Sequence, residues 1–422
     1  GAHYVAAPNP EARPALRLLH AIGAVTGWDA AGRPTFDPTR LCHAPSERLF
    51  YRGAWVDGLV PEGLGAADAA DVERFADLEE ELLELEGSDG RPAFTIPVEL
   101  SSRDPDLLAL DRLSMRDWLD REGYRAPFLR WSVRYACLDD FGGEPEDVSA
   151  WAGLHYFAAR KLRSADLAGS HYLVWPEGNG RLVRALVELG RPRVRTRALA
   201  THVAPTRGGV EVGYLDVATG RARRVLARAA VVATPGFVTT RLVPACAPLP
   251  ARAASPWIVA NLHVGWPFEP DRAWDSVIHD ADGLGYVDAR HQMTELRDGT
   301  VLTYYRAYGA PDVRASRAAL LAARWGDLAE AVLRDLAPAH PHLVEELDVI
   351  DVMVWGHAMP RPRPGFLGER PFDAPVLVAP SVAWAHVDQT GMALFEEALL
   401  RGVRAAEALG PALGVDVGET WT

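Results

Sequence analysis

The chain has 422 residues, of which 48% are hydrophobic and 24% charged, and its formal net charge is −13. This length predicts two intertwined domains rather than one core, and the composition is typical of a globular protein. The negative charge argues against nonspecific binding of nucleic acid, and no apolar stretch reaches the roughly 18 residues of a membrane span. We therefore expect a small-molecule substrate as the partner, no nucleic acid and no transmembrane segment in this sequence; oligomeric state and localisation stay open.

The first part of the chain is predicted to be mainly helical. A hairpin is expected at 48–56. Apolar residues recur at helical spacing in one segment before this hairpin and in three segments after it. The predicted helices span 10–25, 71–85, 127–138 and 149–161. Asp139 and Asp140 follow the third of them. Because neighbours on a helix point about 100° apart, a helix end is favoured here over a paired-carboxylate site.

The second part changes to strands. A helix at 180–189 follows a Gly-Asn-Gly turn, and four short strands with glycine turns between them resemble a β-meander. These strands are expected at 199–203, 210–215, 224–227 and 230–233. A second sheet follows, with strands at 257–266, 301–307 and 349–359 and helices at 314–324 and 327–336.

Two strands of the second sheet alternate between apolar and polar or aromatic residues. Ile258, Ala260, Leu262 and Val264 share one face of the first, and Ile350, Val352 and Val354 share one face of the second. The opposite faces carry Asn261 and His263, and Asp351, Met353, Trp355 and His357. Such a face is costly to bury unless it meets solvent, partners or a ligand. Two alternatives stay open: a cavity, or packing under the helices of 314–336.

The C-terminal part has a strand at 374–380 and a helix that begins near Met392. Its apolar face is predicted to hold Met392, Phe395, Leu399, Val403 and Ala406, with Glu397, Arg401 and Arg404 facing away. Thr390 is the expected N-cap, and Gly391 permits close approach to the backbone. A helix N-terminus with open N–H groups suits a flavin carbonyl or a phosphate. An ordinary strand–loop–helix unit is the alternative.

Three segments carry a family resemblance. The run Gly391-Met-x-x-Phe-Glu-Glu-Ala-x-x-Arg-Gly-x-x-Ala-Ala406 resembles the C-terminal flavin-contacting segment of the FAD-dependent amine oxidase, protoporphyrinogen oxidase and phytoene desaturase superfamily. Ala230-Val-Val-Ala-Thr-Pro-Gly-Phe237 is similar to a strand of these proteins, and Trp175-Pro-Glu-Gly-Asn-Gly-Arg-Leu182 to their glycine-rich loop before a helix. The order of the three segments extends the resemblance over nearly the whole chain.

The resemblance implies a mixed α/β (α+β) fold. In this fold an FAD-binding Rossmann-like domain, truncated at its N-terminus here, is interleaved with a substrate domain of a mixed β-sheet and helices. The FAD-binding domain is expected to comprise 1–45, 168–256 with the β-meander, and the C-terminal segment 365–422. The substrate domain is expected to comprise the helical part 46–167 and the sheet and helices of 257–364.

The resemblance also implies FAD as the cofactor. The residues expected to contact it are Gly1, Ala2, His3, Trp175, Gly178, Asn179, Gly180, Val203, Ala233, Thr234, Pro235, Gly391 and Met392. The family opens with a strand, a Gly-x-Gly-x-x-Gly turn and a helix that bind the pyrophosphate, and no such fingerprint occurs in this sequence. Since Gly1-Ala-His-Tyr resembles the point just after that unit, we expect the unit to precede Gly1 in the native protein.

The expected activity is that of an FAD-dependent oxidoreductase. It would dehydrogenate a largely apolar or aromatic small molecule, with the hydride passing to the flavin. Trp355, His357 and His263 are the predicted catalytic residues, and no metal site is expected because the three cysteines are scattered. Lys161 is the single lysine and lies outside the substrate sheet, which argues against an amine oxidase that uses a lysine near the flavin. Flavin amine oxidase and a non-catalytic binding module remain the alternatives.

Overall fold

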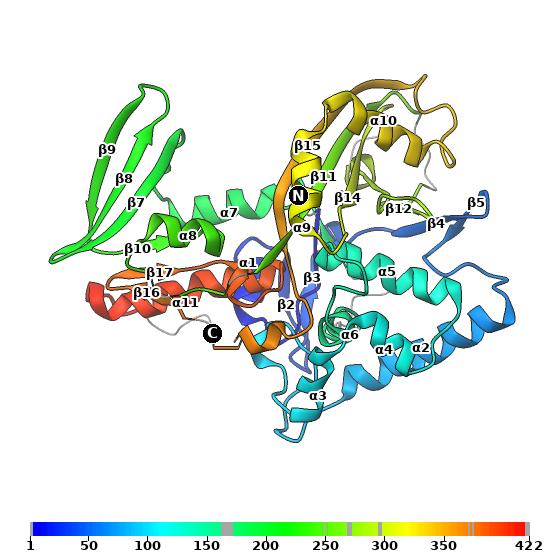
Figure 1. The fold of residues 1–422 in the computed structure, drawn as a ribbon, viewed down its shortest axis with the longest axis horizontal. Helices are drawn as coiled ribbons and strands as arrows, with labels where there is room; N and C mark the ends of the chain where they lie inside the picture. The colour runs from blue at the N-terminus through cyan, green and yellow to red at the C-terminus, as the bar shows by residue number, and fades with distance from the viewer. Residues whose placement is uncertain are drawn as a thin grey trace.

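The structure is a computed structural model that describes residues 3–161, 172–246, 248–250, 252–267, 272–293, 298–369, 372–373 and 375–417. Two long neighbouring strands, β11 (Ala253–Val264) and β15 (Leu347–Arg361), run through its middle (Figure 1). Helices lie on both sides of them in Figure 1, and a small three-stranded sheet projects on one side. The predicted cofactor residues Gly1 and Ala2 and the first residue of the predicted strand at 374–380 lie outside the described residues.

The largest sheet of the described residues is mixed and has seven strands. Its order is β15-β11-β14-β13-β12-β4-β5, and every pair is antiparallel except β12 with β4. The strands not yet given are β14 (Thr300–Ala307), β13 (Tyr286–Asp288), β12 (Asp275–Ile278), β4 (Glu47–Tyr51) and β5 (Ala54–Asp57). The hairpin expected at 48–56 and the three expected strands of this sheet are confirmed.

Helices α9 (Val313–Ala322) and α10 (Trp325–Leu336) cover one face of this sheet. Apolar side chains of the sheet and of both helices form one core there: Ile258, Ala260, Leu262, Leu320, Leu328, Val332 and Leu336, with Ile350 and Val352 packed against them. This confirms the predicted alternation in both strands, because side chains of a strand point alternately to its two faces. Trp355 lies on the other face, opposite Trp257, and 51% of it is exposed. The two helices therefore do not cover it.

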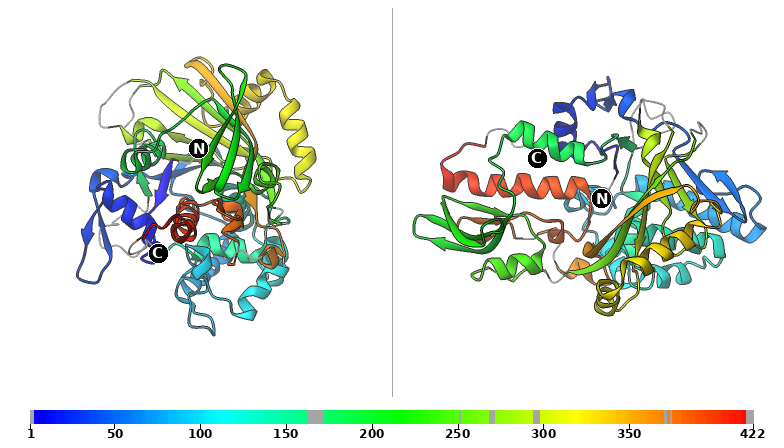
Figure 2. Two further views of the ribbon diagram at one scale, coloured as in Figure 1. Left: turned by 90° about the vertical axis from the view of Figure 1, so that its left-hand side faces the viewer. Right: turned by 90° about the horizontal axis from the view of Figure 1, so that it is seen from above.

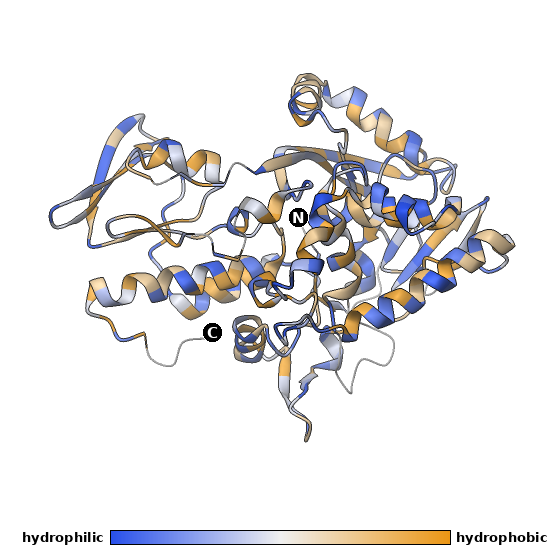
Figure 3. Cartoon of the chain, turned by 60° about the horizontal axis from the view of Figure 1, so that its bottom comes forward, coloured by the Kyte–Doolittle hydropathy of each residue, from blue (hydrophilic) through white to orange (hydrophobic). Residues whose placement is uncertain are grey.

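Five helices form the helical part: α2 (Ala66–Glu84), α3 (Pro105–Ala109), α4 (Met115–Arg121), α5 (Pro127–Phe141) and α6 (Ala150–Ala158). Several helices in Figure 3 alternate between orange and blue, as expected for helices with one buried face, whereas α6 is buried along most of its length. Ser114 caps α4 by accepting a hydrogen bond from the N–H of Asp117, 3.1 Å away. Helix α5 packs against the face of the sheet that α9 and α10 leave open, through Leu138, Trp257 and Leu284.

The remaining elements carry the three segments with the family resemblance, and we call them the flavin-type part. They are β1 (Tyr4–Ala6), α1 (Arg13–Ala21), β2 (Val25–Trp28), β3 (Pro34–Phe36), β6 (Tyr172–Val174), α7 (Gly180–Gly190), β7 (Ala198–Thr206), β8 (Gly209–Asp216), β9 (Arg221–Ala227), β10 (Ala230–Val232), α8 (Gly236–Leu242), β16 (Leu377–Ala379), β17 (Val382–Trp384) and α11 (Phe395–Leu413). Short 3-10 turns are η1 (Pro38–Arg40), η2 (Val98–Leu100), η3 (Leu110–Arg112), η4 (Ala289–Gln292), η5 (Phe366–Glu369) and η6 (Val387–Gln389). The strands β7, β8 and β9 form a meander of three strands, which lies at the far end of α11 in both Figures 1 and 2. The fourth strand expected in it, at 230–233, is β10, which instead pairs in parallel with β17 in another sheet, so this part of the prediction was wrong.

The C-terminal helix departs from the prediction in two ways. It begins at Phe395 rather than near Met392, and its N-cap is Leu394 without a side-chain hydrogen bond, so Thr390 is not the cap. Glu397 and Arg401, predicted to face away, are buried. Glu397 Oε1 accepts a hydrogen bond from the N–H of Val98, and Arg401 pairs with a glutamate of η2. The amphipathic pattern failed because α11 packs against both α1 and η2, so more than one of its faces is covered.

Among the described residues, no helix is long and apolar enough to cross a membrane.

Candidate functional site

Strand β10 pairs in parallel with β17. This pairing brings the family-like segment 230–237 close to the one that begins at Gly391. Ala230 lies opposite Val382 and Val232 opposite Trp384. Beyond the strands, Trp384 Nε1 donates a hydrogen bond to the carbonyl oxygen of Thr234, 2.9 Å away. The predicted cofactor residue Val203 packs in the same apolar cluster as Val232 and Trp384. Val203, Ala233, Thr234 and Pro235 thus lie near the segment that leads to Gly391.

Asp388 fixes the loop that precedes Gly391. Its Oδ2 accepts a hydrogen bond from the N–H of Gly236 at 2.8 Å, and its Oδ1 lies 3.2 Å from His386 Nδ1. Burial raises the pKa of Asp388, but the hydrogen bonds from His386 and Gly236 outweigh it and leave the pKa below its usual value. The carboxylate therefore ties the start of α8 to the loop between β17 and α11.

The backbone at Gly391 is open to close approach. Its φ is +82°, and a Cβ there would lie 3.3 Å from the Cζ atom of Arg252. A side chain is disfavoured both by this conformation and by the neighbouring guanidinium. Met392, next in sequence, is buried in the core of the helical part. The N-cap residue of α11, Leu394, makes no side-chain hydrogen bond to the first turn of the helix.

The third family-like segment packs beside the other end of the flavin-type part. β6 pairs with β1, and Asn179 Nδ2 donates a hydrogen bond to the carbonyl oxygen of Tyr4 at 2.8 Å. Gly178 has a φ of +57° and closes the turn between Trp175, which is buried, and Gly180, which begins α7. Asn179 Oδ1 and His3 Nε2 are buried and have no hydrogen-bond partner among the described residues. Burial lowers the pKa of His3 to about 4, so its imidazole is neutral.

An inner polar group lies between these strands, the central sheet and helices α5 and α6. Its members are Tyr4, Glu47, Tyr135, Asp139, Asp140, Tyr156, Tyr172, Asp275 and Tyr305, and each is half-buried. The Tyr172 hydroxyl donates to Glu47 Oε1 at 3.2 Å, and the Tyr305 hydroxyl donates to Asp275 Oδ2 at 3.2 Å. The rings of Tyr4 and Tyr172 are 4.7 Å apart, and both contact the buried ring of Trp274 at 5.5 and 5.7 Å.

Burial dominates the titration of the inner polar group. It raises the pKa of Asp139 to about 7, helped by the charge of Asp140, and it raises the pKa of Asp275 well above its usual value. The pKa values of Glu47 and Asp140 are also raised by burial; Arg160, just after α6, opposes the rise at Asp140. Four carboxyl groups with raised pKa values thus lie in one region, a feature that is frequent at functional sites.

Sequence analysis missed this group. Asp139 and Asp140 do lie in the last turn of α5, as expected, but they also face the inner region. One signal was present in the sequence: Trp131, Tyr135 and Asp139 are four residues apart, which puts them on one face of a helix. An aromatic stripe that ends in a carboxylate differs from an ordinary helix end.

The three predicted catalytic residues do not lie together. His357 packs against Phe237 of α8 with ring centroids 4.4 Å apart; burial lowers its pKa, and the charge of Asp388 opposes that effect. His357 and Trp355 are therefore at the end of β15 that is near the Gly391 loop. His263 lies opposite Val349 in the register of β11 with β15. Val349 is six residues from Trp355, which corresponds to about 20 Å at the usual rise of a strand. His263 is exposed, and its Nε2 atom is 3.9 Å from Asp351.

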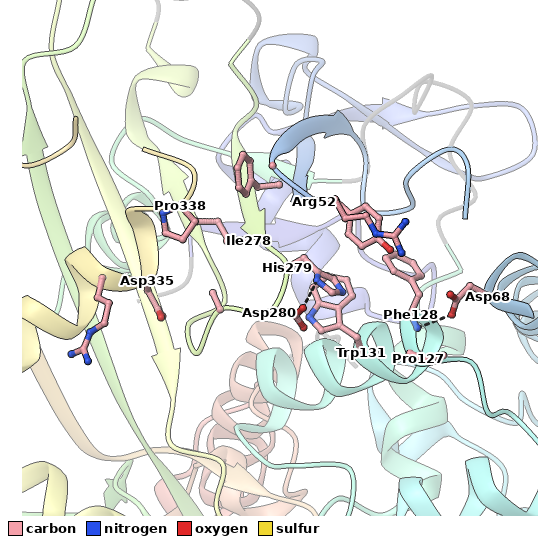
Figure 4. A pocket seen from close by; sticks show the side chains of 15 residues that line it. Arg52, Asp68, Pro127, Phe128, Trp131, Ile278, His279, Asp280, Asp335 and Pro338 are labelled. Carbon is pink, nitrogen blue, oxygen red and sulfur yellow. Dashed lines mark hydrogen bonds and ion pairs between the residues drawn. The ribbon is translucent and has the colours of Figure 1, made fainter. Parts of the chain in front are cut away.

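A large cavity lies elsewhere. It encloses about 720 Å³ beside the β4–β5 turn, α5, the end of β12 and the end of α10 (Figure 4). None of the predicted site residues lines it. Among the described residues, no group of three or more His, Cys, Asp or Glu side chains is arranged to hold a metal ion.

Comparisons with known proteins define the class. A triple mutant of putrescine oxidase with redesigned cofactor binding superposes with a TM-score of 0.68 at 15% identity, covering 97% of this chain and 88% of that one. Cyclohexylamine oxidase from Brevibacterium oxydans IH-35A gives 0.67 at 15% identity, over 98% and 88%. A fatty acid isomerase from P. acnes that produces CLA gives 0.62 at 13% identity, over 97% and 86%. A search of curated proteins found no match.

The fold is therefore that of the flavin-dependent oxidases, and the mixed α/β architecture expected from the sequence is confirmed. The model of the flavin-containing amine oxidoreductases matches residues 28–410. The chain belongs to this family and is an FAD-dependent oxidoreductase. This confirms the predicted class of enzyme and the predicted cofactor, and it disfavours the non-catalytic alternative.

The residues present suit a flavin. The two buried polar atoms without described partners, Asn179 Oδ1 and His3 Nε2, offer an acceptor and a ring nitrogen at the β1–β6 end. The uncapped first turn of α11 offers N–H groups at the Gly391 end, where the helix dipole favours partial negative charge. Both ends border the inner polar group. The donor set therefore matches a ligand with carbonyl oxygens, hydroxyls and a polar ring edge.

Proposed function

We propose that this protein dehydrogenates a largely apolar or aromatic small molecule within the inner polar group. The observation that carries the proposal is the cluster of rings there: Tyr4, Tyr172 and Trp274 contact one another, and Tyr305 faces them from the sheet. Aromatic faces suit a flat or apolar body, while the hydroxyls and carboxyls orient its polar atoms. FAD, when bound, accepts the hydride.

The cofactor contacts proposed from the sequence remain those of His3, Trp175, Gly178, Asn179, Gly180, Val203, Ala233, Thr234, Pro235, Gly391 and Met392, together with Gly1 and Ala2. His3 and Asn179 would use their side chains, and the positions around Gly391 would use the backbone. Support comes from the pairing of β10 with β17 and from the open conformation at Gly391.

The variant Gly391→Val tests this assignment. A branched side chain at a φ of +82° costs about 1–2 kcal/mol and would crowd the cofactor. FAD occupancy of the full-length protein, measured from the flavin absorbance per chain, should fall far more than the melting temperature of the apoprotein. Gly402→Ala is the matched control because Gly402 is helical and has open space around its Cβ position. Equal occupancy in Gly391→Val and the parent would remove the assignment.

Trp355 and His357 are proposed as the wall and the hydrogen-bond donor at the other side of the flavin. The contact of His357 with α8 and its charge interaction with Asp388 support a place near the Gly391 loop. His263, which we also proposed as catalytic, has no such support, since it lies at the opposite end of the strand.

Amine oxidation is the second candidate, favoured by one observation. Glu47, Asp139, Asp140 and Asp275 face the same region, and carboxylates attract a protonated amine. A lysine-assisted amine step is not expected. Lys161 is half-buried; burial lowers its pKa, and the nearby charges belong to Glu11 and Glu86 rather than to the inner polar group. If Lys161→Met abolished turnover of a primary amine while FAD stayed bound, this expectation would be wrong.

Matched reductants separate the two candidates. The holoenzyme would be mixed without oxygen with an aromatic amine and with a neutral analogue of the same shape, and bleaching of the flavin would be followed. Bleaching by the neutral analogue supports the first candidate. Bleaching by the amine alone, weakened at least tenfold by Asp139→Asn, supports the second, because the carboxylate then recognises the cation. If neither compound bleaches the flavin in a broad panel, the inner polar group is not the substrate site.

A further inference from the structure

The 720 Å³ cavity has an aromatic wall built around one histidine. The ring of His279 is 4.6 Å from Trp131, 4.9 Å from Tyr51 and 6.1 Å from Phe128, and it stacks on Phe128 with an interplanar angle of 5° (Figure 4). His279 Nδ1 also lies 3.0 Å from Asp280 Oδ2. Aromatic faces of this kind suit flat or apolar small molecules. The cavity opens at the surface, far along the sheet from β15.

Helix α5 connects this cavity to the inner polar group. Trp131, Tyr135 and Asp139 lie on one stripe of the helix and are each half-buried. The rings of Trp131 and Tyr135 stack with centroids 5.9 Å apart. The stripe therefore runs from the wall of the cavity, at Trp131, to a carboxyl of the inner polar group, at Asp139.

A narrow hollow follows the same stripe. It shares Trp131, Ile278 and Ala281 with the large cavity and adds Tyr135 and Leu284, among others. Its volume is only about 10 Å³, space for about one water. The turn that forms its outer wall is fixed, because the N–H of Gly283 donates to Asp335 Oδ2 at 2.6 Å. We call this hollow the neck. Because its outer wall is fixed, its opening depends on the rings of Trp131 and Tyr135.

Beyond the neck lies accessible interior surface. Tyr135, Tyr305 and Asp275 influence one another electrostatically, and burial is the largest cause of the raised pKa of each. All three nevertheless keep part of their surface exposed. These side chains are surrounded by protein and still have accessible surface, so they must border an internal space. This space begins on the inner side of Tyr135.

We propose that the large cavity is the entrance for the substrate and that Trp131 and Tyr135 form the gate between it and the inner polar group. A flat or apolar molecule would first bind against His279 and the rings around it. It would then pass the neck when the two stacked rings rotate. This inference rests on the proposed function, since it takes the inner polar group as the place of reaction, and it identifies the part of the surface where substrate size and shape are selected.

The test blocks the neck after the protein has folded. Ala281 is half-buried and lines both the cavity and the neck, so Ala281→Cys puts a thiol at their junction. Cys246 is replaced by Ser, whereas Cys42 and Cys137 are buried. The purified holoenzyme is modified with a small methylthio group or with bulky N-benzylmaleimide. Ala319→Cys, at an exposed position on α9, is the matched control.

Two readouts follow. The first is the rate at which menadione, a flat quinone, reoxidises dithionite-reduced FAD by taking up two electrons and two protons. We expect the benzyl label at position 281 to slow this rate at least tenfold, with no change for the methylthio label or for either label at position 319. The second needs no cofactor: 2-naphthol should slow alkylation of the thiol at position 281 in the apoprotein several-fold, and not of the thiol at position 319.

An unchanged menadione rate with the benzyl label at position 281 would overturn the proposed entrance. Alkylation that 2-naphthol does not slow would overturn binding against the aromatic wall. Failure of the proposed function looks different: no compound in the reductant panel would bleach the flavin, while the menadione rate would still depend on the label at position 281.

Discussion

Two buried polar networks meet at the end of α5, and they are built in opposite ways. In the first, the guanidinium of Arg361, 2% exposed, donates to Asp147 at 2.7 Å, to Ser255 at 2.9 Å and to the carbonyl oxygen of Gly142 at 2.6 Å. In the second, the inner polar group, Glu47 and Asp275 accept hydrogen bonds from tyrosines, and the charge of Arg160 acts on Asp139 and Asp140.

The difference between the two networks shows which of them stabilises the fold and which serves function. A buried charge whose hydrogen bonds are satisfied holds the chain together, and its removal leaves its partners without compensation. Carboxyls that burial keeps at raised pKa values are costly to the fold and are retained where chemistry or binding needs them. Arg361 fixes the end of α5 against β11, and the fixed helix end presents Asp139 to the interior.

Removing Arg361 should have the largest effect. Arg361→Met leaves Asp147 and the carbonyl oxygen of Gly142 with fewer partners, so we expect a loss of about 3–5 kcal/mol in the free energy of unfolding. Denaturant titration measures it. Arg363→Met is the control, because Arg363 also pairs with Asp147 but its side chain is 40% exposed. Equal losses in the two variants would show that burial does not distinguish them.

Asp139→Asn should change the pH dependence of stability. The usual pKa of 3.8 is raised to about 7 in the folded chain, so the unfolded chain releases its proton first as pH rises. The parent should therefore lose stability between about pH 4 and pH 7. The variant, which has no proton to release at this position, should lose less over the same window.

Chemical denaturation at a series of pH values measures this difference. Asp348→Asn, at an exposed position on β15, is the control and should keep the profile of the parent. If the profiles of Asp139→Asn and the parent coincide, the inner polar group is more solvated than its burial indicates.

The smallest effect is expected for an exposed ion pair near the first network. Arg116 pairs with Glu146, and their side chains are 51% and 43% exposed. Solvent screens such a pair, so Arg116→Ala should cost less than about 1 kcal/mol. A loss above about 2 kcal/mol, persisting in high salt, would mean that pairing alone stabilises this part of the chain.

Sequence patterns predicted elements well where alternate residues face one apolar layer. The strand at 257–266 has one face under α9 and α10, so its period of two was visible and correct. The same reasoning failed for Glu397 and Arg401, because α11 is covered on more than one side and periodicity cannot show how many neighbours a helix has. The proposed domain boundaries remain predictions.

Site residues were harder to predict than elements. The family-like segments around Thr234 and Gly391 converge because β10 and β17 pair, and this pairing could not be predicted from the order of the segments. The inner polar group draws on seven strands and helices, and no local pattern joins Glu47 to Asp275. His263 and His357 share a sheet, but the register that separates them depends on which residues of β11 and β15 lie opposite each other.

The hydrogen bond from the N–H of Gly236 to Asp388 joins residues 152 positions apart. During synthesis on the ribosome, β10 emerges long before its parallel partner β17. Its backbone N–H and C=O groups stay unpaired until β17 has been made. Contacts of such sequence separation form slowly, since a long loop must close before any of them is made. The Gly391 region therefore completes its folding only when nearly the whole chain is available. Acquisition of flavin would mark the end of maturation, and chains stalled before β17 would expose a sheet edge to aggregation or to chaperones.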